Sequence, residues 1–286
     1  MASLTALKNI ADSYGFQLRL RGQLGPRLAY TTLYWGCYLA ARYGPRRLDS
    51  GGAHCAAFAY LGRSGRSART VTVATPQGLR LRVDLMTAFM VLKELYGERI
   101  YEDCDLDDFR VGEGQVVFDI GSQQGVFAVA AARRAGAGGR VVAVEPEPRN
   151  RELLLENIAL NGLSNVRVFD CAISDQEGSA RLFINAENTG AHSLVGAGSG
   201  RHVVVRTITL DRLAREAGCA PQLIKIDVEG STLAVLRGGL ETIAASKPRI
   251  VLELDAPEDE ATIRTLLEPL GYRLRRKGNN LFASAA

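Results

Sequence analysis

The chain of 286 residues contains only five cysteines and three histidines, and it has no long uninterrupted apolar run. The cysteines lie far apart without a Cys-x-x-Cys pair, which excludes a dense disulfide framework and the common cysteine-ligated zinc motifs. Because the N-terminus shows no secretory signal, we expect reduced thiols in a cytoplasmic protein. Hydrophobic residues make up 47% of the chain and charged residues 23%, which is typical of a globular domain.

Acidic residues are scarce in the first part of the chain. Residues 1–80 contain 11 lysines and arginines and two acids, a net charge of +9, whereas residues 81–286 contain 24 against 29, a net charge of −5. The basic part is expected to meet an anionic surface, to dock on the acidic remainder, or to carry only scattered solvated arginines. The chain has no base-clamping motif of the Asn-Pro-Pro-Tyr type, so no nucleic-acid partner is expected.

The uncharged, aromatic-rich stretch 28–41 has an arginine on either side. It is too short to span a bilayer, and we interpret it as a core helix or as a helix at a homodimer interface. The alternative is a peripheral membrane contact through residues 28–47, with Trp35 and the tyrosines at headgroup level. Residues 1–69 are therefore expected to form a helical, basic extension of a domain that comprises residues 70–286.

The most informative stretch is residues 116–125, VVFDIGSQQG. Its first three residues form an apolar run of the kind found in buried parallel strands. Asp119 follows, Gly121 and Gly125 mark a turn, and an alanine-rich run with helical spacing begins after it. Strand, glycine turn and helix predict the start of a doubly wound α/β sheet, with a ligand crevice outside the carboxyl end of the strand.

The ligand expected in this crevice is positively charged. The spacing G-S-Q-Q-G lacks the middle glycine of a dinucleotide fingerprint, and the Asp119 carboxylate would repel a pyrophosphate. S-adenosylmethionine (SAM) carries a sulfonium and an ammonium group and no phosphate. The turn therefore favours SAM over NAD.

The next expected strand, 140–145, carries a second acid at its end. Glu145 follows Gly125 by 20 residues, a distance at which an acid can accept hydrogen bonds from both hydroxyls of a ribose. The alternative is that Glu145 only caps a helix beginning near Pro146, where an acidic side chain complements the helix dipole.

The alternation of strands and helices continues to the end of the chain. We expect strands at 165–169, 179–185, 202–208, 223–226 and 249–255, helices at 147–162, 211–217 and 258–270, and an antiparallel edge at 272–276 and 280–284. A hairpin at 70–74 and 79–83 and a helix at 86–97 precede the glycine turn. These elements predict one doubly wound domain.

Further polar residues follow two of the expected strands. Asp170 comes directly after 165–169, where a carboxylate can accept the adenine amino group, although a merely turn-forming aspartate fits equally well. Asp227 and Glu229 come after the strand LIKI. Lys225 lies inside that strand, where a charge is unusual, so it should have an acidic partner or point into the cleft.

The chain contains the segments DIGSQQG, VEPEPRNRELLLENIALNGLSNVRV, AISDQEG, TITLDRL, LIKIDVEGSTLAVLRGG and KPRIVLEL. Together they resemble the FkbM-type family of class I SAM-dependent methyltransferases over about residues 70–254, and IKIDVEG is the most specific of them. The resemblance implies a Rossmann-like sheet. The cofactor contacts that it implies are Asp119, Gly121 and Gly125 at the methionine end, Glu145 at the ribose, Asp170 and Ala172 by the adenine, and Asp227 near the methyl group.

One pair of residues departs from this family. Where its members more often have Ala-Asn between the glycines, this chain has Ser122 and Gln123. Both pairs fit a turn, so Ser122 is kept among the expected cofactor-binding residues, with altered side-chain contacts.

The reaction implied by the resemblance is O-methylation of a hydroxyl group on a sugar or natural-product small molecule. An aliphatic hydroxyl must lose its proton, which requires a base within hydrogen-bond reach. The candidates are Asp227, Glu229, Glu253, His192 and His202, of which we predict Asp227, Glu229 and His192 to be catalytic.

Carboxylates at neighbouring strand ends could instead hold a divalent ion such as Mg²⁺, which would lower the pKa of a bound diol. Asp227, Glu229, Glu253 and Asp255 are suitable, but they form no dense DxD-type cluster, so a metal is not favoured. Glu253 would then pair with Lys225. A carboxylate or phenol acceptor would need neither base nor metal. The rival classes are an NAD-dependent oxidoreductase and a non-catalytic binding protein of the same fold.

Overall fold

The computed structural model describes residues 70–75, 77–84, 87, 109–185, 192–195, 200–254 and 257–285. The expected N-terminal extension, its membrane-contact stretch 28–47 and most of the helix expected at 86–97 lie outside the described residues. The chain divides into two compact units, residues 1–98 with 186–190 and residues 99–185 with 191–286, and the domain boundary at residue 70 stays a prediction. Within the described ranges, no helix is long and apolar enough to cross a membrane.

The first unit contains the expected hairpin. β1 (Thr70–Ala74) and β2 (Arg80–Asp84) pair antiparallel along their whole length. The amide of Thr75 donates to the carbonyl of Leu79 at 2.8 Å, and the amide of Gly78 donates to the carbonyl of Thr75 at 3.0 Å. The predicted hairpin is confirmed, with its second strand one residue later than expected.

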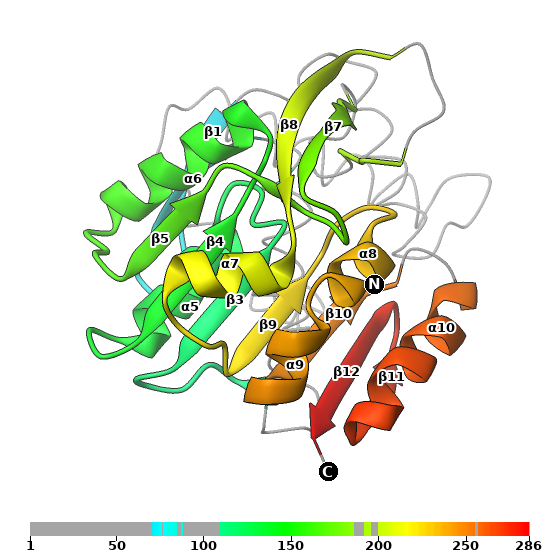
Figure 1. The fold of residues 1–286 in the computed structure, drawn as a ribbon. Coiled ribbons are helices and arrows are strands. Elements are labelled where there is room, and N and C mark those ends of the chain that lie inside the picture. Colours follow the sequence, from blue (N-terminus) through cyan, green and yellow to red (C-terminus); the bar gives the residue numbers. More distant parts are fainter. Residues whose placement is uncertain are drawn as a thin grey trace, which may run out of the picture. The chain divides into compact units, whose positions relative to one another are not determined.

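Seven strands of the second unit form the main sheet, in the order β11-β12-β10-β9-β3-β4-β5 (Figure 1). They are β3 (Val116–Ile120), β4 (Arg140–Val144), β5 (Val166–Phe169), β9 (Leu223–Ile226), β10 (Arg249–Glu253), β11 (Tyr272–Lys277) and β12 (Asn280–Ala285). Neighbouring strands are parallel except β12, which is antiparallel to both β10 and β11. From the central β3 the chain runs outward to β5 and returns to β9 on the other side. The predicted doubly wound sheet with an antiparallel edge is therefore confirmed.

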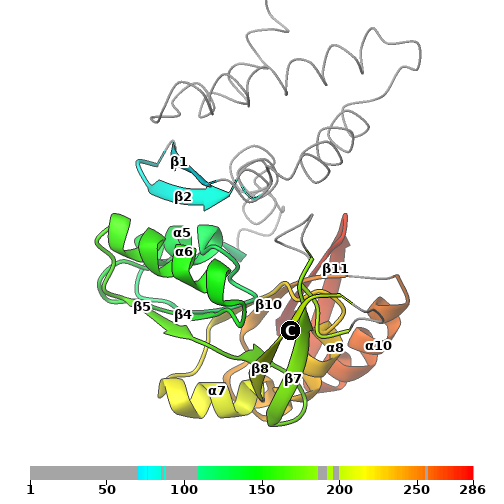
Figure 2. The same ribbon diagram turned by 90° about the horizontal axis from the view of Figure 1, so that it is seen from above.

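Helices cover both faces of this sheet (Figure 2). On one face lie α5 (Val126–Ala135) and α6 (Pro148–Leu160), and on the other lie α7 (Leu210–Ala217), α8 (Thr232–Arg237), α9 (Leu240–Ser246) and α10 (Pro257–Leu267), which the 3₁₀ turn η4 (Glu268–Leu270) extends. Side chains alternate along β3: Val117 packs with the alanines of α5, whereas Phe118 and Ile120 pack with apolar residues of α7 to α10. Asp119 therefore points toward the α5 side.

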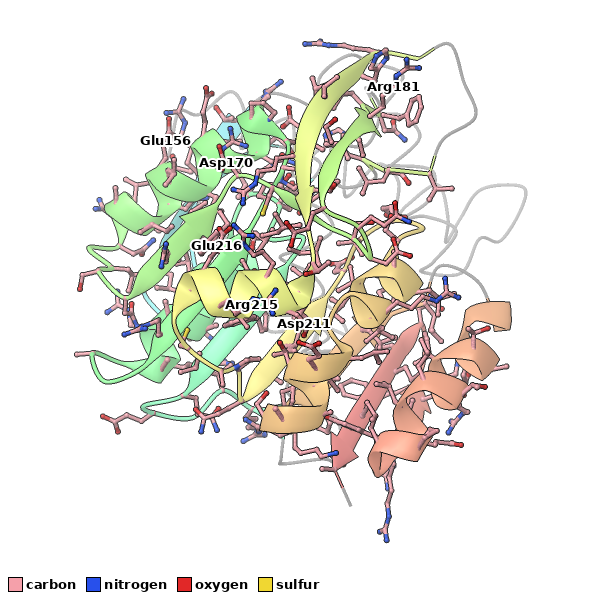
Figure 3. The ribbon with its side chains drawn as sticks, viewed as in Figure 1. Glu156, Asp170, Arg181, Asp211, Arg215 and Glu216 are labelled. Atoms are coloured by element: carbon pink, nitrogen blue, oxygen red, sulfur yellow. The ribbon has the colours of Figure 1, made fainter. Side chains whose placement is uncertain are left out.

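A separate sheet of three strands branches from the chain after β5. It contains β6 (Ala172–Ile173), β7 (Gly178–Phe183) and β8 (His202–Ile208), with β8 in the centre. β7 and β8 extend beyond the main sheet as an arm, on which Arg181 lies (Figures 1 and 3). The sequence predicts both long strands but not their separation from the main sheet. The new sheet begins with the two-residue β6, which is too short to show a periodicity.

The ends of β3 and β9 come into close backbone contact. The amide of Asp227 donates to the carbonyl of Ile120 at 3.0 Å. Gly121 has a φ of +82°, and a Cβ atom at this position would collide with the backbone carbonyl of Asp227. The first glycine of the turn is therefore required by the protein's own packing, independently of any ligand.

We predict that Gly121→Ala destabilises the protein more than Gly162→Ala. Both glycines have positive φ, +82° and +61°, so each alanine carries a backbone cost of about 1–2 kcal/mol. A Cβ at position 162 would meet no atom within 4 Å, whereas one at 121 meets backbone. Denaturant unfolding should show an additional loss of about 2 kcal/mol for Gly121→Ala. Equal losses would show that the contact between β3 and β9 relaxes freely.

Candidate functional site

Four charged side chains meet where β3, β4 and β9 end. Asp119 is in β3, Glu145 follows β4, Lys225 is in β9 and Asp227 follows β9. Asp119 and Lys225 are register partners on adjacent parallel strands, so their side chains emerge on the same face. The sequence predicted these strand ends as the ligand crevice, and the structure brings the four residues together there.

Asp119 is a buried carboxylate with an unusual lack of partners. Its side chain is 0% exposed, and neither oxygen accepts a hydrogen bond within the described part of the chain. The nearest cation, Lys225 Nζ, lies 3.6 Å from Oδ1, beyond ordinary hydrogen-bond length. Burial raises the pKa of Asp119, while the lysine opposes this shift. A buried carboxylate without a described hydrogen bond, with one ammonium at 3.6 Å, is unfavourable until a further cationic group reaches it.

Lys225 lies between two acids. Its Nζ is 2.9 Å from Asp227 Oδ2 and 3.6 Å from Asp119 Oδ1, and it lies 5.7 Å from the centre of the Phe127 ring of α5. The expectation of an acidic partner is confirmed. The described ion-pair partners are these two aspartates rather than Glu253, which ends the neighbouring strand β10.

Glu145 joins two loops at the end of β4. It is 5% exposed, Oε2 accepts the amide of Gln123 and Oε1 accepts the amide of Glu147, both at 2.8 Å. Burial raises its pKa from 4.5 to about 7, although both hydrogen bonds act in the opposite direction. The alternative that Glu145 caps the next helix is wrong. Helix α6 begins at Pro148, and its N-cap is Glu147, whose carboxylate accepts the amide of Asn150 at 2.7 Å.

The turn between the glycines is held by hydrogen bonds that the sequence analysis missed. The Ser122 hydroxyl donates to the Asp119 carbonyl at 2.8 Å and accepts the Val144 amide at 3.0 Å, so it links β3 to β4. The buried Gln124 amide group donates to Asn150 at 3.2 Å, and Asn157 donates to the Gln124 carbonyl at 2.8 Å. The hydrogen-bond partners of the turn are remote in sequence. The polar character of the turn is therefore the one sequence feature that could have indicated this network. A cofactor contact of Ser122 stays a prediction.

The second glycine of the turn serves helix packing. Gly125 has a φ of +80°, and a Cβ atom there would collide with the side chain of Leu154 on α6. It therefore allows α5 and α6 to approach at the start of α5.

The residues expected at the adenine lie beside Glu145. The Glu145 amide donates to the Phe169 carbonyl at 3.1 Å, which joins the end of β4 to the end of β5. Asp170 follows β5 and is exposed (Figure 3), whereas Ala172, in β6, is buried. Along the rim, the residues expected at the adenine thus follow the residue expected at the ribose, as predicted. The adenine contacts of Asp170 and Ala172 stay predictions.

A short segment connects the arm to the loop after β9. Ser193 forms bridges with Phe183 of β7 and with Glu229, and its hydroxyl donates to the Glu229 carbonyl at 2.7 Å. The residue that follows His192 is therefore in contact with Glu229, which lies two residues after Asp227. The Asn185 amide donates to His192 Nδ1 at 3.0 Å, so a neutral His192 carries its proton on Nε2 and presents a donor there.

The remaining candidates belong to other elements, although His202 is paired with Phe183, which also bridges to Ser193. His202 begins β8 on the exposed arm, with its ring 6.1 Å from that of Phe183, and Glu253 ends β10. Asp255 lies outside the described residues. Within the described ranges, no three His, Cys, Asp or Glu side chains are grouped so that they could hold a metal ion.

The comparison with known sequences identifies a family. A family model described as the methyltransferase FkbM domain matches residues 119–274, more than half of the chain. Methyltransferase 1 of Beauveria bassiana (strain ARSEF 2860) is 24% identical over 202 residues, which cover 63% of this chain and 79% of that protein. Methyltransferase sdnD of Sordaria araneosa is 25% identical over 227 residues, which cover 68% and 85%.

Solved structures with a similar arrangement include methyltransferase FkbM from Methylobacillus flagellatus KT, with a TM-score of 0.45 and 17% identity. That alignment covers 87% of this chain and 60% of the other, so this chain spans less than two thirds of that protein. A SAM-dependent methyltransferase from Aquifex aeolicus has a TM-score of 0.39 and 17% identity, with 68% and 91% covered.

We predict that Asp119→Asn weakens SAM binding more than tenfold, because the variant keeps the shape of the side chain but cannot meet the cofactor's positive charge. The ligand-free protein should lose less than about 1 kcal/mol of stability, since the substitution removes a buried charge that, within the described residues, has no hydrogen bond and only one cation, at 3.6 Å. Calorimetric titration with SAM and thermal unfolding measure the two effects. Glu156→Gln, on the exposed side of α6 (Figure 3), is the matched control and should bind SAM normally.

The affinity for SAM should rise with pH around neutrality. Because the Glu145 pKa is about 7, this carboxyl is partly protonated there, and ribose hydroxyls donate best to the ionised form. Titration of Glu145 alone raises the affinity for SAM at most about tenfold between pH 6 and pH 8. Calorimetry at both values measures it, and Glu145→Gln should abolish this contribution.

The same group should affect stability with the opposite sign. Because the native pKa of Glu145 lies above the ordinary 4.5, its protonation stabilises the ligand-free fold. This stabilisation is complete below pH 4.5 and is lost as the pH rises through about 7.

For SAM binding, an affinity that falls with pH in the wild type but not in Glu145→Gln would contradict the role of Glu145 as an acceptor of the ribose hydroxyls.

Proposed function

Because the chain belongs to the FkbM family of methyltransferases, we propose that it methylates a hydroxyl oxygen of a small molecule, such as a sugar or a natural-product alcohol. SAM is the methyl donor, and it supplies a methyl group bound to a positively charged sulfur. The family assignment makes the chain a methyltransferase rather than an oxidoreductase.

The observation that supports the donor site is the orphaned Asp119 carboxylate. When ionised, Asp119, Lys225 and Asp227 together carry one net negative charge, and SAM carries one net positive charge. Asp119 would receive the cationic end of the cofactor, and Glu145 would accept its ribose hydroxyls. The chain's contribution is to bind and orient the donor, and alignment of this kind provides much of the rate enhancement in a displacement reaction.

The acceptor side is expected at Asp227 and Glu229. The Asp227 side chain is 37% exposed and Glu229 is exposed, so either carboxylate can meet a hydroxyl from solvent. The acceptor oxygen gains the methyl group, its O–H proton passes to the carboxylate, and the sulfur retains the electron pair of the broken S–C bond. His192, with its proton on Nε2, would orient the acceptor as a donor, which favours a carboxylate as the base.

A carboxylate or phenol acceptor remains the second candidate, since its oxygen is already ionised or readily ionised and needs no strong base. The two carboxylates on the acceptor side, Asp227 and Glu229, favour the alcohol, because their negative charges would repel an anionic acceptor.

We predict methyl transfer to alcohols in an assay with labelled SAM across sugars, hydroxy acids, phenols and lipids. Glu229→Gln should lower turnover of the best acceptor at least tenfold with SAM affinity unchanged, because it removes a base but no donor contact. Glu156→Gln is the control, and parallel reactions with EDTA report any divalent ion. Transfer confined to carboxylic acids or phenols, or no transfer at all despite SAM binding, would overturn the proposal.

A further inference from the structure

Asp227 and Asp119 compete for one lysine, and they do so unequally. Lys225 Nζ lies 2.9 Å from Asp227 and 3.6 Å from Asp119, so only the first contact has hydrogen-bond length. Asp119 is the fully buried member of the pair, while the Asp227 side chain is 37% exposed. A buried ammonium would ordinarily pair with the buried carboxylate, which gains most from neutralisation.

The backbone explains this preference. The Asp227 amide is bonded to the Ile120 carbonyl, and the Asp227 carbonyl lies against Gly121, so the position of Asp227 is fixed relative to β3. Lys225 is fixed by its place in β9 and by Phe127 above its ammonium. The contact of Lys225 with Asp227 therefore joins two residues whose backbones are held in place by the pairing of β3 with β9.

We propose that Asp227 is a positioning residue, which draws the ammonium of Lys225 away from Asp119 and so leaves Asp119 available to the cofactor. This inference rests on the proposed function, because it concerns the same donor site. Asp227 then affects donor binding through Lys225, without any contact of its own with the cofactor.

A distinctive consequence follows for variants of Asp227. Asp227→Asn removes the stronger counterion, so Lys225 is left with Asp119 as its described acidic partner. The ammonium then neutralises Asp119 and competes with the positive charge of SAM. The second substitution, Lys225→Met, removes this competing charge. In that background, Asp227→Asn should have little further effect on the affinity for SAM.

A double-mutant cycle tests this directly, with SAM and S-adenosylhomocysteine as ligands in calorimetric titrations of the full chain. We expect Asp227→Asn to weaken SAM binding about tenfold or more in the wild-type background, but less than about threefold in the Lys225→Met background. The matched control is Lys277→Met, which replaces an exposed lysine on the edge strand β11. It should change neither the affinity for SAM nor the effect of Asp227→Asn on that affinity.

The outcomes separate this inference from the proposed function. Equal losses from Asp227→Asn in both backgrounds would overturn the inference, because they indicate a direct contact of Asp227 with the cofactor. Failure of the wild-type protein to bind SAM would overturn the proposed function itself. Thermal unfolding identifies variants that do not fold, and Lys225→Gln then replaces Lys225→Met with the same expectations.

Discussion

The site depends on a charge that the fold leaves without hydrogen bonds. Asp119 is the penultimate residue of the otherwise apolar strand β3, it is shielded from water, and its closest described cation is shared with another acid. Such a group lowers the stability of the ligand-free protein. The apolar layers on both sides of β3 offset this cost, so the same strand contributes to the core and carries a buried charge.

Much of this site could be predicted from the sequence. Apolar runs located the parallel strands, and because such strands end at a common rim, the acids Asp119, Glu145 and Asp227 could be placed together. The presence of Lys225 in a buried strand likewise required an acidic partner. These inferences hold because each depends on a single strand and its immediate end.

Other features could not be predicted, because they depend on pairs of residues that are far apart in the chain. Ser122 bonds to Val144, and Gln124 bonds to Asn150. The short helices α8 and α9 gave no periodic signal, since each has fewer than eight residues. The glycines are a related case: their spacing looks like a ligand motif, but the atoms they avoid belong to Asp227 and Leu154.

The arm of β7 and β8 is joined to the loop after β9 through residues 192–195, in which Ser193 bonds to Glu229 and Val195 lies against Gly230. The expected donor site lies where β3, β4 and β9 end, and the Asp227 amide bonds this same loop to Ile120 of β3. The arm and the expected donor site are therefore connected through the loop after β9. If the proposed function is correct, a change in the length or composition of the arm is expected to affect the acceptor side and, through this loop, the position of Asp227.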